Sequence, residues 1–306
     1  MTKRILGYQQ EIGNEIFRPI RYEGGISMEK MIRTTLKSLE ARNLKSHFAE
    51  NCKEARSLVL KLVPAHATVG VGDSSTVRQI GIIKSLEKRG TKVINPFDPE
   101  KTVKDHKTYF NLLFRPTIEA TLCDVFLTGT NVVTQDGRLL NIDAAGNRVA
   151  GMFWGHPKSV IVVGRNKIVK NLEEAFHRIK NVTVPEHLKR RGSRTPCAIT
   201  GKCHDCIGKV RRCAVTTIIE SKPLLTDVNV VIINEDLGLG WDQSWPKKRI
   251  QGIAMRHEKW KWTVPNKVVE TVDHKAMWEA VLLKFRFSVN GQIKIQNGNK
   301  KSKRMF

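Results

Sequence analysis

The sequence predicts an α/β protein built on a mostly parallel, doubly wound sheet. Two continuous apolar runs, SVIVV at Ser159–Val163 and VNVVII at Val228–Ile233, are typical of strands buried on both faces. Elsewhere, segments with helical spacing of apolar residues alternate with short strand-like segments. This alternation indicates parallel strands joined by helices, with a ligand pocket at the carboxyl ends of the strands.

The first elements lie in the N-terminal quarter of the chain. Residues 1–27 show no sustained periodicity and are predicted to form a loosely structured leader. Apolar spacing predicts a helix over Glu29–Arg42, and a short strand follows at His47–Ala49. Asn51 with a glutamate three residues later resembles a capping box, so a second helix is expected between Asn51 and Pro64.

A glycine turn follows the next strand, which is expected at Thr68–Val71. The strand runs into GVGDSST at Gly70–Thr76 and then into a helix. Free backbone N–H groups at such a turn, together with the positive end of the helix dipole, favour an anion or phosphate. A Gly-x-Gly pair also serves as a plain tight turn, with Asp73 or Ser74 as a helix cap. Ser75 stands where the dinucleotide fingerprint has its third glycine, so a nicotinamide cofactor is not expected.

The next elements continue the alternation. A strand is predicted at Lys92–Asn95, followed by helices at about Pro99–Phe114 and Pro116–Leu122. A further helix is predicted over Leu172–Ile179, between the two apolar runs.

The stretch from Asp124 to Gly151 is the centre of the predicted organisation. A strand at Val125–Leu127 breaks at TGTN, and two β-like pieces follow at Asn131–Thr134 and Arg138–Ile142. The Asp-Gly pair between these pieces is a strong hairpin signal, because glycine accepts the positive φ of a tight turn. Small and polar residues at Asp143–Arg148 then provide the groups that a ligand pocket in an open sheet needs.

The turns after neighbouring parallel strands are expected to line one site for a small organic acid or a phosphorylated ligand. Arg148 would pair with the carboxylate or phosphate. Alternatively, each Asn and Asp merely completes a turn, which is the commonest role of these residues. The candidate ligand-binding residues are Gly70, Gly72, Ser74, Ser75, Thr130, Asn131, Asp143, Gly146 and Arg148. No nucleophile or general base is legible, which leaves open whether this chain is catalytic.

Four cysteines form the sharpest chemical motif. Cys197, Cys203, Cys206 and Cys213 follow the pattern Cys-x5-Cys-x2-Cys-x6-Cys, within a small module predicted at residues 195–214. Thiolates bind zinc and iron strongly, and flanking Lys and Arg favour the thiolate form. The spacing matches neither the ferredoxin run nor the usual paired zinc pattern. Zinc, an iron–sulfur cluster and four unliganded thiols therefore remain as alternatives.

The charge of the chain is strongly positive. It has 53 Lys and Arg against 29 Asp and Glu, a formal net charge of +24. Contact with nucleic acid or other anionic partners is therefore physically plausible. Neither a bilayer-spanning run nor an apolar signal core is present in the sequence, so a cytoplasmic protein without a membrane span is expected.

Residues 241–306 form a basic, Trp-rich extension. From Lys247 to Phe306 there are 15 Lys and Arg against four Asp and Glu. Tryptophans interleaved with cations suit stacked bases and phosphates, so single-stranded nucleic-acid binding is an alternative function. The competing interpretation is that the tryptophans pack against the α/β domain and that 300–304 is a solvated tail. The residues concerned are Trp241, Trp245, Trp260, Trp262, Trp278, Lys247, Lys248, Arg249, Lys259 and Lys261.

Several long motifs in one order resemble the lactate-utilisation (LUD) domain family, of the type with a C-terminal four-cysteine motif. They are GVGDSSTVRQIG, DVFLTGTNVVTQDGRLLNIDAAGNRVA, VIVVGRNKIVKNLEEAFHRIKNV, TPCAITGKCHDCIGKVRRC and VIINEDLG. The resemblance covers about residues 28–240. It implies a fold like that of the ribose-phosphate isomerase and CoA-transferase group. It also implies an accessory role in iron–sulfur-dependent oxidation of L-lactate to pyruvate, with iron–sulfur oxidoreductase subunits as partners.

Overall fold

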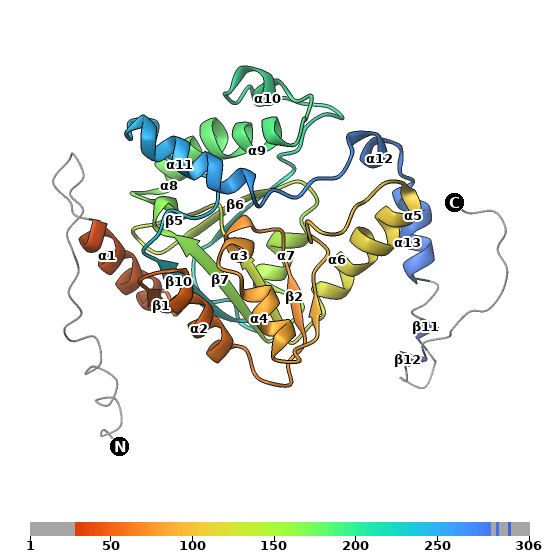
Figure 1. Ribbon diagram of the computed structural model, residues 1–306, viewed down its shortest axis with the longest axis horizontal. Helices are drawn as coiled ribbons and strands as arrows, with labels where there is room; N and C mark the ends of the chain where they lie inside the picture. The colour runs from red at the N-terminus through yellow and green to blue at the C-terminus, as the bar shows by residue number, and fades with distance from the viewer. Residues whose placement is uncertain (1–27, 283–285, 288–292, 295–306) are drawn as a thin grey trace.

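The computed structural model of the protein describes residues 28–282, together with the short segments 286–287 and 293–294. The predicted leader at 1–27 and the basic tail at 300–304 lie outside the described residues. Helices cover a central sheet, as the ribbon shows (Figure 1). Within the described residues, no helix has the length and apolar character that a membrane crossing requires.

Six parallel strands make the central sheet, in the order β1-β10-β7-β4-β2-β3. In that order the strands are Lys45–Ala49, Asp227–Ile233, Lys158–Gly164, Val125–Gly129, Val69–Val71 and Val93–Ile94. The two apolar runs of the sequence form β7 and β10, which are hydrogen-bonded neighbours inside the sheet. The predicted mostly parallel sheet is therefore confirmed.

The two faces of this sheet are covered by different helices. Because side chains alternate along a strand, Val160 and Val162 of β7 join one apolar core and Ile161 and Val163 join another. The first core includes residues of α2 and α4, and the second includes residues of α1 and α7. These helices are Cys52–Leu62, Ile82–Lys88, Met28–Ala41 and Asn147–Phe153, respectively. Both faces are buried, as a doubly wound sheet requires.

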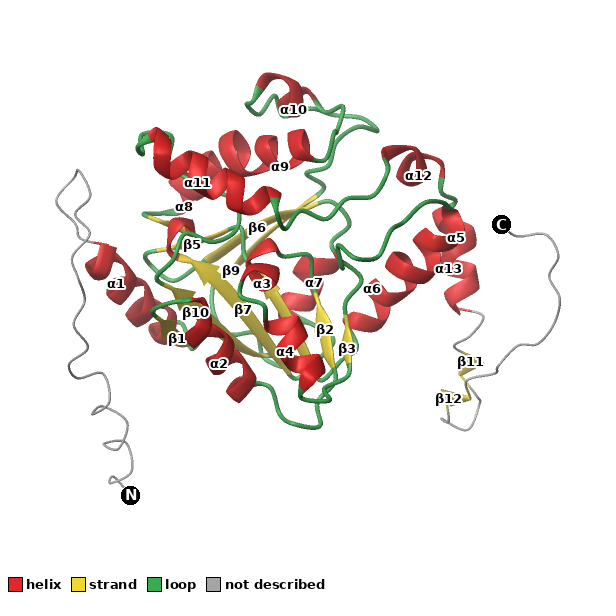
Figure 2. Ribbon diagram, in the orientation of Figure 1, coloured by secondary structure: helices red, strands yellow, loops and turns green. Residues whose placement is uncertain are grey.

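A smaller sheet of four strands lies beside the first, in the order β8-β5-β6-β9 (Figure 2). Its strands are Ile168–Val169, Val132–Thr134, Leu139–Asp143 and Val215–Ile219. The predicted hairpin is confirmed, since β5 pairs antiparallel with β6 and Gly137 has a φ of 86°. The hairpin does not extend the parallel sheet, however. β9, which the sequence did not reveal, pairs with β6 and gives the hairpin a sheet of its own.

Three predicted helix boundaries were wrong, for local reasons. The helix expected from Pro99 begins at α5, His106–Tyr109, because Asp105 makes a capping box with Thr108. It continues without a break through η1, Phe110–Phe114, and α6, Arg115–Ala120. The single helix expected after the glycine turn is split into α3, Ser75–Gln79, and α4. Gly81, with a φ of 67°, separates them.

The helix after β8 runs further than its sequence pattern indicates. α8, Leu172–Arg178, continues through η3, Ile179–Thr183, into α9, Val184–Arg190. Pro185 does not stop it, because proline is tolerated in a first turn and the π-helical turn before it adjusts the backbone. α9 thereby reaches the carboxyl edge of the large sheet, where it supplies His187 and is followed directly by Arg191.

The C-terminal extension packs against the α/β domain. It contains α11, Lys247–Glu258, α12, Asn266–Thr271, and α13, His274–Leu282. Trp241 and Trp262 are buried, and Arg249 covers the ring of Trp245 at 3.5 Å. Within residues 28–282, only Trp260, Trp278 and Trp154 keep a third or more of their surface exposed. The packing interpretation of most of these tryptophans is therefore confirmed, which weakens the stacking argument for nucleic acid.

Candidate functional site

The glycine turn and the Thr-Asn turn meet at the carboxyl edge of the parallel sheet. β2 and β4 are paired from Val69 with Val125 to Val71 with Leu127. At the end of β4, a Cβ added to Gly129 would lie 2.5 Å from the Ser74 hydroxyl. The structure therefore brings the two predicted turns together, as parallel pairing requires.

The glycines of the first turn serve close packing. A Cβ at Gly70 would lie 1.9 Å from the carbonyl oxygen of Ala120, and one at Gly72 would lie 2.7 Å from the Thr128 hydroxyl. Ser74 caps α3, since its hydroxyl accepts from the backbone N–H of Val77. These three residues shape the turn: the Gly72 N–H donates to the Leu127 carbonyl of β4, and the Ser74 hydroxyl serves as the cap.

Arg148 is fully engaged inside the protein. Its Nε faces the Asp143 carboxylate at 3.2 Å, and its two terminal nitrogens donate to Asn131, Asn141 and the carbonyls of Gly129 and Ile142. Asp143 also accepts from the backbone of Gly146, which starts α7 with a φ of 86°. These predicted ligand residues thus form one network that fixes the hairpin to the end of β4. The Arg148 guanidinium has few donors left for a ligand.

Lys167 supplies the buried amine at this edge. It lies in η2, Arg165–Lys167, directly after β7, and its side chain is buried with 6% exposed. Its amine donates to the Thr76 hydroxyl at 3.1 Å and to the Thr130 carbonyl at 3.0 Å, and both acceptors are neutral. Within residues 28–282 it forms no ion pair. Burial, then the charge of Arg148, lowers the pKa of Lys167 to about 7.

Sequence reasoning missed this lysine. The available signal was its position, in GRNKIV, immediately after the most apolar run of the chain. Gly238, in the segment after β10, packs directly against the amine. A Cβ at this position would lie 2.6 Å from the Lys167 Nζ and 2.5 Å from the Thr76 Oγ1. Its φ of 72° also favours glycine.

Two neutral histidines complete the edge. Their ring centroids lie 6.5 Å apart, with His187 in α9 and His257 in α11, and the Nδ1 of His257 is 3.1 Å from the Ser75 hydroxyl. Burial, then the charge of Arg191, lowers the pKa of His187 to about 4. Burial, then His187, lowers the pKa of His257 to about 3. Both rings are therefore uncharged near pH 7.

The carboxylate of Asp73 faces the same region. Arg78 donates to it at 2.9 Å and also holds the carbonyl of Trp260 at 2.8 Å. Burial alone would raise the pKa of Asp73, but Arg78 and then Arg191 hold it below its ordinary value. We call Asp73, Arg78, Lys167, His187, Arg191 and His257 the carboxyl-edge cluster.

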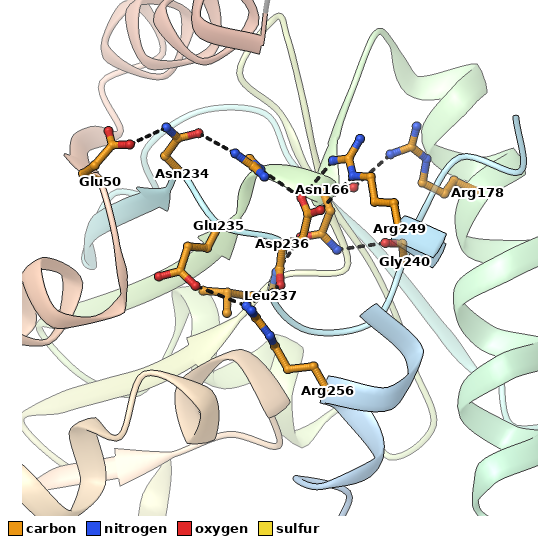
Figure 3. A network of polar contacts seen from close by, with 11 residues as sticks. Glu50, Asn166, Arg178, Asn234, Glu235, Asp236, Leu237, Gly240, Arg249 and Arg256 are labelled. Carbon is orange, nitrogen blue, oxygen red and sulfur yellow. Dashed lines mark hydrogen bonds and ion pairs between the residues drawn. The ribbon is translucent and has the colours of Figure 1, made fainter. Parts of the chain in front are cut away.

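The C-terminal extension is anchored over this edge by a polar network (Figure 3). Arg249 of α11 binds Asp236 through two nitrogens, at 2.7 and 2.8 Å, and Arg165 binds the same carboxylate at 3.0 Å. Asn166 spans the segment after β10, since it accepts from the Leu237 N–H and donates to the Gly240 carbonyl, each at 2.8 Å. Figure 3 shows Arg249 and Asn166 converging on this segment. The anchored segment places Gly238 and His257 in the site.

The four-cysteine module lies outside the carboxyl-edge cluster. Cys197 is buried in α10, Pro196–Thr200, while the other three thiols are partly buried in the loop that follows. Burial, then Cys197, Cys203 and Cys206, raises the pKa of Cys213, so the other three thiols lie within electrostatic reach of Cys213. In the described part of the chain, however, no three Cys, His, Asp or Glu side chains are arranged to hold a metal ion.

The fold and the cluster define a class: an α/β protein with a parallel sheet whose carboxyl edge gathers a buried amine, guanidinium groups and neutral histidines. The family model of the LUD domain matches residues 32–233, more than half of the chain. The chain therefore belongs to the LUD domain family. The matched region ends at β10, so Gly238 and the whole extension, with His257, lie beyond it.

One solved structure is distantly similar to this chain. It is a DUF162 family protein from Deinococcus radiodurans, which is 13% identical, with 68% of this chain and 99% of that chain covered, at a TM-score of 0.36. No curated protein sequence matches the chain.

Proposed function

We propose that this LUD domain protein binds a small organic acid at the carboxyl edge of its sheet, with Lys167 as the cation that pairs with the ligand's carboxylate. The burial of Lys167 between two neutral oxygens carries this proposal. A buried ammonium is costly unless an anion compensates it, and the glycine-turn edge of a parallel sheet is where such folds bind ligands.

Two of the other cations at the edge are already paired, and a third, Arg191, lies within electrostatic reach of Asp73. Arg148 is held by Asp143, and Arg78 by Asp73. Gly238 packs against the Lys167 amine, and the lysine is only 6% exposed, so a ligand reaches the amine only when the residues around it move. L-Lactate and pyruvate are the first probes, because the family resemblance implies an accessory role in iron–sulfur-dependent lactate oxidation. We also propose that the protein has this accessory role and that its partners are iron–sulfur oxidoreductase subunits.

Calorimetric titration of the full chain with L-lactate and with pyruvate tests the proposal. Binding is expected in the unchanged protein and is expected to disappear in Lys167→Met, while Lys84→Met, at a lysine that is 75% exposed, retains it. Only the charged amine attracts the anion, so affinity should be constant below about pH 7 and fall about tenfold per pH unit above it. Equal affinity in the Lys167→Met variant, or no binding of either acid at pH 6, contradicts the proposal.

We further propose that Cys197, Cys203, Cys206 and Cys213 bind zinc or an iron–sulfur cluster after a local rearrangement of their loops. The electrostatic reach of the other three thiols to Cys213 supports this. Gly201 and Gly208, with φ of 80° and 89°, are points at which the loops can turn.

Metal analysis with an absorption spectrum of anaerobically purified protein tests the cysteine proposal. Iron with visible absorbance is expected for a cluster, and zinc in a colourless sample for a zinc site. The Cys203→Ser, Cys206→Ser variant should lose the metal. The matched control is Cys52→Ser, because the Cys52 thiol lies in α2 and burial raises its pKa to about 11. Protein without metal, or metal retained in the double variant, excludes this site.

A further inference from the structure

A basic cleft opens beside the carboxyl-edge cluster. It has a volume of about 510 Å³ and lies between the end of α9, the loop from Pro99 to Val103, and the segment from Lys261 to Asn266. Among the described residues, four cations line it and no carboxylate does. The lining cations are Lys101, Arg190, Arg191 and Lys261. The third wall belongs to the C-terminal extension, beyond the region that the LUD domain matches.

The walls of the cleft are fixed by internal contacts. Asn266 donates to the carbonyl of Gly192 at 2.8 Å, which ties the extension to the end of α9. Trp262 is buried edge-on against Phe97, with ring centroids 5.2 Å apart. The cleft is therefore a preformed feature, because three separate parts of the chain hold its shape.

Arg191 differs from the other three cations. Arg190 and Lys261 are both paired with Glu258, and Lys101 lies 3.7 Å from Asp98. The guanidinium of Arg191 lies over the Trp262 ring at 5.5 Å, and no residue within 28–282 accepts a hydrogen bond from it or forms an ion pair with it. Burial is the main cause that lowers the pKa of Arg191, and the charge of Asp73, which forms no ion pair with it among the described residues, only partly opposes that effect. A partly buried guanidinium has five donors to satisfy.

We infer that this cleft is a binding site for a small phosphorylated molecule, with Arg191 as the two-pronged anchor of a phosphoryl group and Lys101 and Lys261 as flanking charges. A guanidinium matches the geometry of phosphate oxygens, and a doubly charged group suits four cations better than a single carboxylate does. The inference does not depend on the proposed organic-acid site, because Lys167 does not line the cleft.

The geometry favours a small molecule over a nucleic acid. Trp262 is 6% exposed and is already covered by Phe97 and Arg191, so it offers no free face on which a base could stack. Stacking on aromatic faces is the main sequence-tolerant contribution in single-strand binding. The charge of the cleft is thus directed at phosphoryl oxygens within a confined volume.

Titration of the full chain with inorganic pyrophosphate and with ADP, at low ionic strength, tests the inference. Binding is expected, and Arg191→Met should weaken it roughly tenfold or more, because a charge-assisted pair is lost while the stem over Trp262 is kept. The Lys101→Glu, Lys261→Glu variant changes two half-exposed side chains and should weaken binding without affecting the fold. Lys222→Glu is the matched control, because Lys222 is exposed on the loop before β10. This variant should bind pyrophosphate and ADP like the unchanged protein.

The outcomes separate this site from the organic-acid site. Lys167→Met should keep its affinity for pyrophosphate, whatever its effect on L-lactate. No pyrophosphate or ADP binding in the unchanged protein overturns the inference, as does unchanged affinity in both cleft variants. Binding of a single-stranded oligonucleotide without binding of either small molecule would assign the cleft to nucleic acid instead and also overturn it.

Discussion

Replacing Lys167 with methionine is expected to stabilise the protein. The lysine is buried against neutral oxygens, so the folded state carries the cost of desolvating an ammonium group. The lowering of its pKa from 10.5 to about 7 corresponds to an upper limit of about 5 kcal/mol. Methionine has a similar length and no charge, and we expect a measured gain of about 2 kcal/mol in the free energy of unfolding at pH 7. Denaturant unfolding measures it.

The pH dependence of this gain has a definite sign. The folded pKa of Lys167 lies below the ordinary value, so the unfolded state binds more protons between about pH 7 and pH 10.5. The stability of the unchanged protein therefore rises with pH in that window, and the advantage of Lys167→Met shrinks there. Lys84→Met, at a surface lysine, should change stability by less than about 0.5 kcal/mol. A Lys167→Met protein that is less stable than the unchanged one at pH 7 contradicts this account of the site.

Replacing both edge histidines with glutamine is expected to make the protein resistant to mild acid. His187 and His257 are held neutral, with pKa values lowered to about 4 and about 3. At pH values below the ordinary histidine pKa of 6.5, the unfolded state binds protons at these two rings, whereas the folded state does not. Stability should thus be full above pH 6.5 and fall by a few kcal/mol as the pH falls toward about 3. Glutamine at both positions should remove most of this slope.

Unfolding measured at a series of pH values between 7 and 4 checks the histidine prediction. The informative quantity is the difference in slope between the double variant and the unchanged protein, because other groups titrate in both. His66→Gln, at an exposed histidine, should leave the slope unchanged. If the double variant loses stability with acid as steeply as the unchanged protein, the two rings are not the groups that the acid protonates.

The strands of the sheet could be predicted from the sequence because the patterns that indicate them are local. SVIVV and VNVVII gave β7 and β10, and the Asp-Gly pair gave the β5–β6 hairpin. Helix ends were less legible, since the cap at Asp105 and the left-handed Gly81 act through single residues within a longer periodic pattern. The placement of the hairpin in a second sheet was not legible, because it depends on pairing with β9, more than seventy residues away.

In the site, too, some features depend on the local sequence and others on contacts between distant segments. The turns at Gly70–Thr76 and Thr128–Asn131 were predicted to meet because parallel pairing carries both to one edge, and they do. Which polar groups remain available there was not predictable. Arg148 looked like the ligand's cation, but its donors are taken by residues that fold back onto it. Lys167 looked like an ordinary loop residue.

The sequence by itself determined the layer architecture, the parallel sheet and the edge at which its turns gather, because apolar period and turn chemistry depend on near neighbours. Only the tertiary structure decided which cations lack partners, since that depends on the acceptors that distant segments bring. His257 and one wall of the basic cleft come from the extension, and Gly238 comes from the segment just before it. Arg191 follows a helix that continues past its expected end. Burial and charge pairing are properties of the assembled edge.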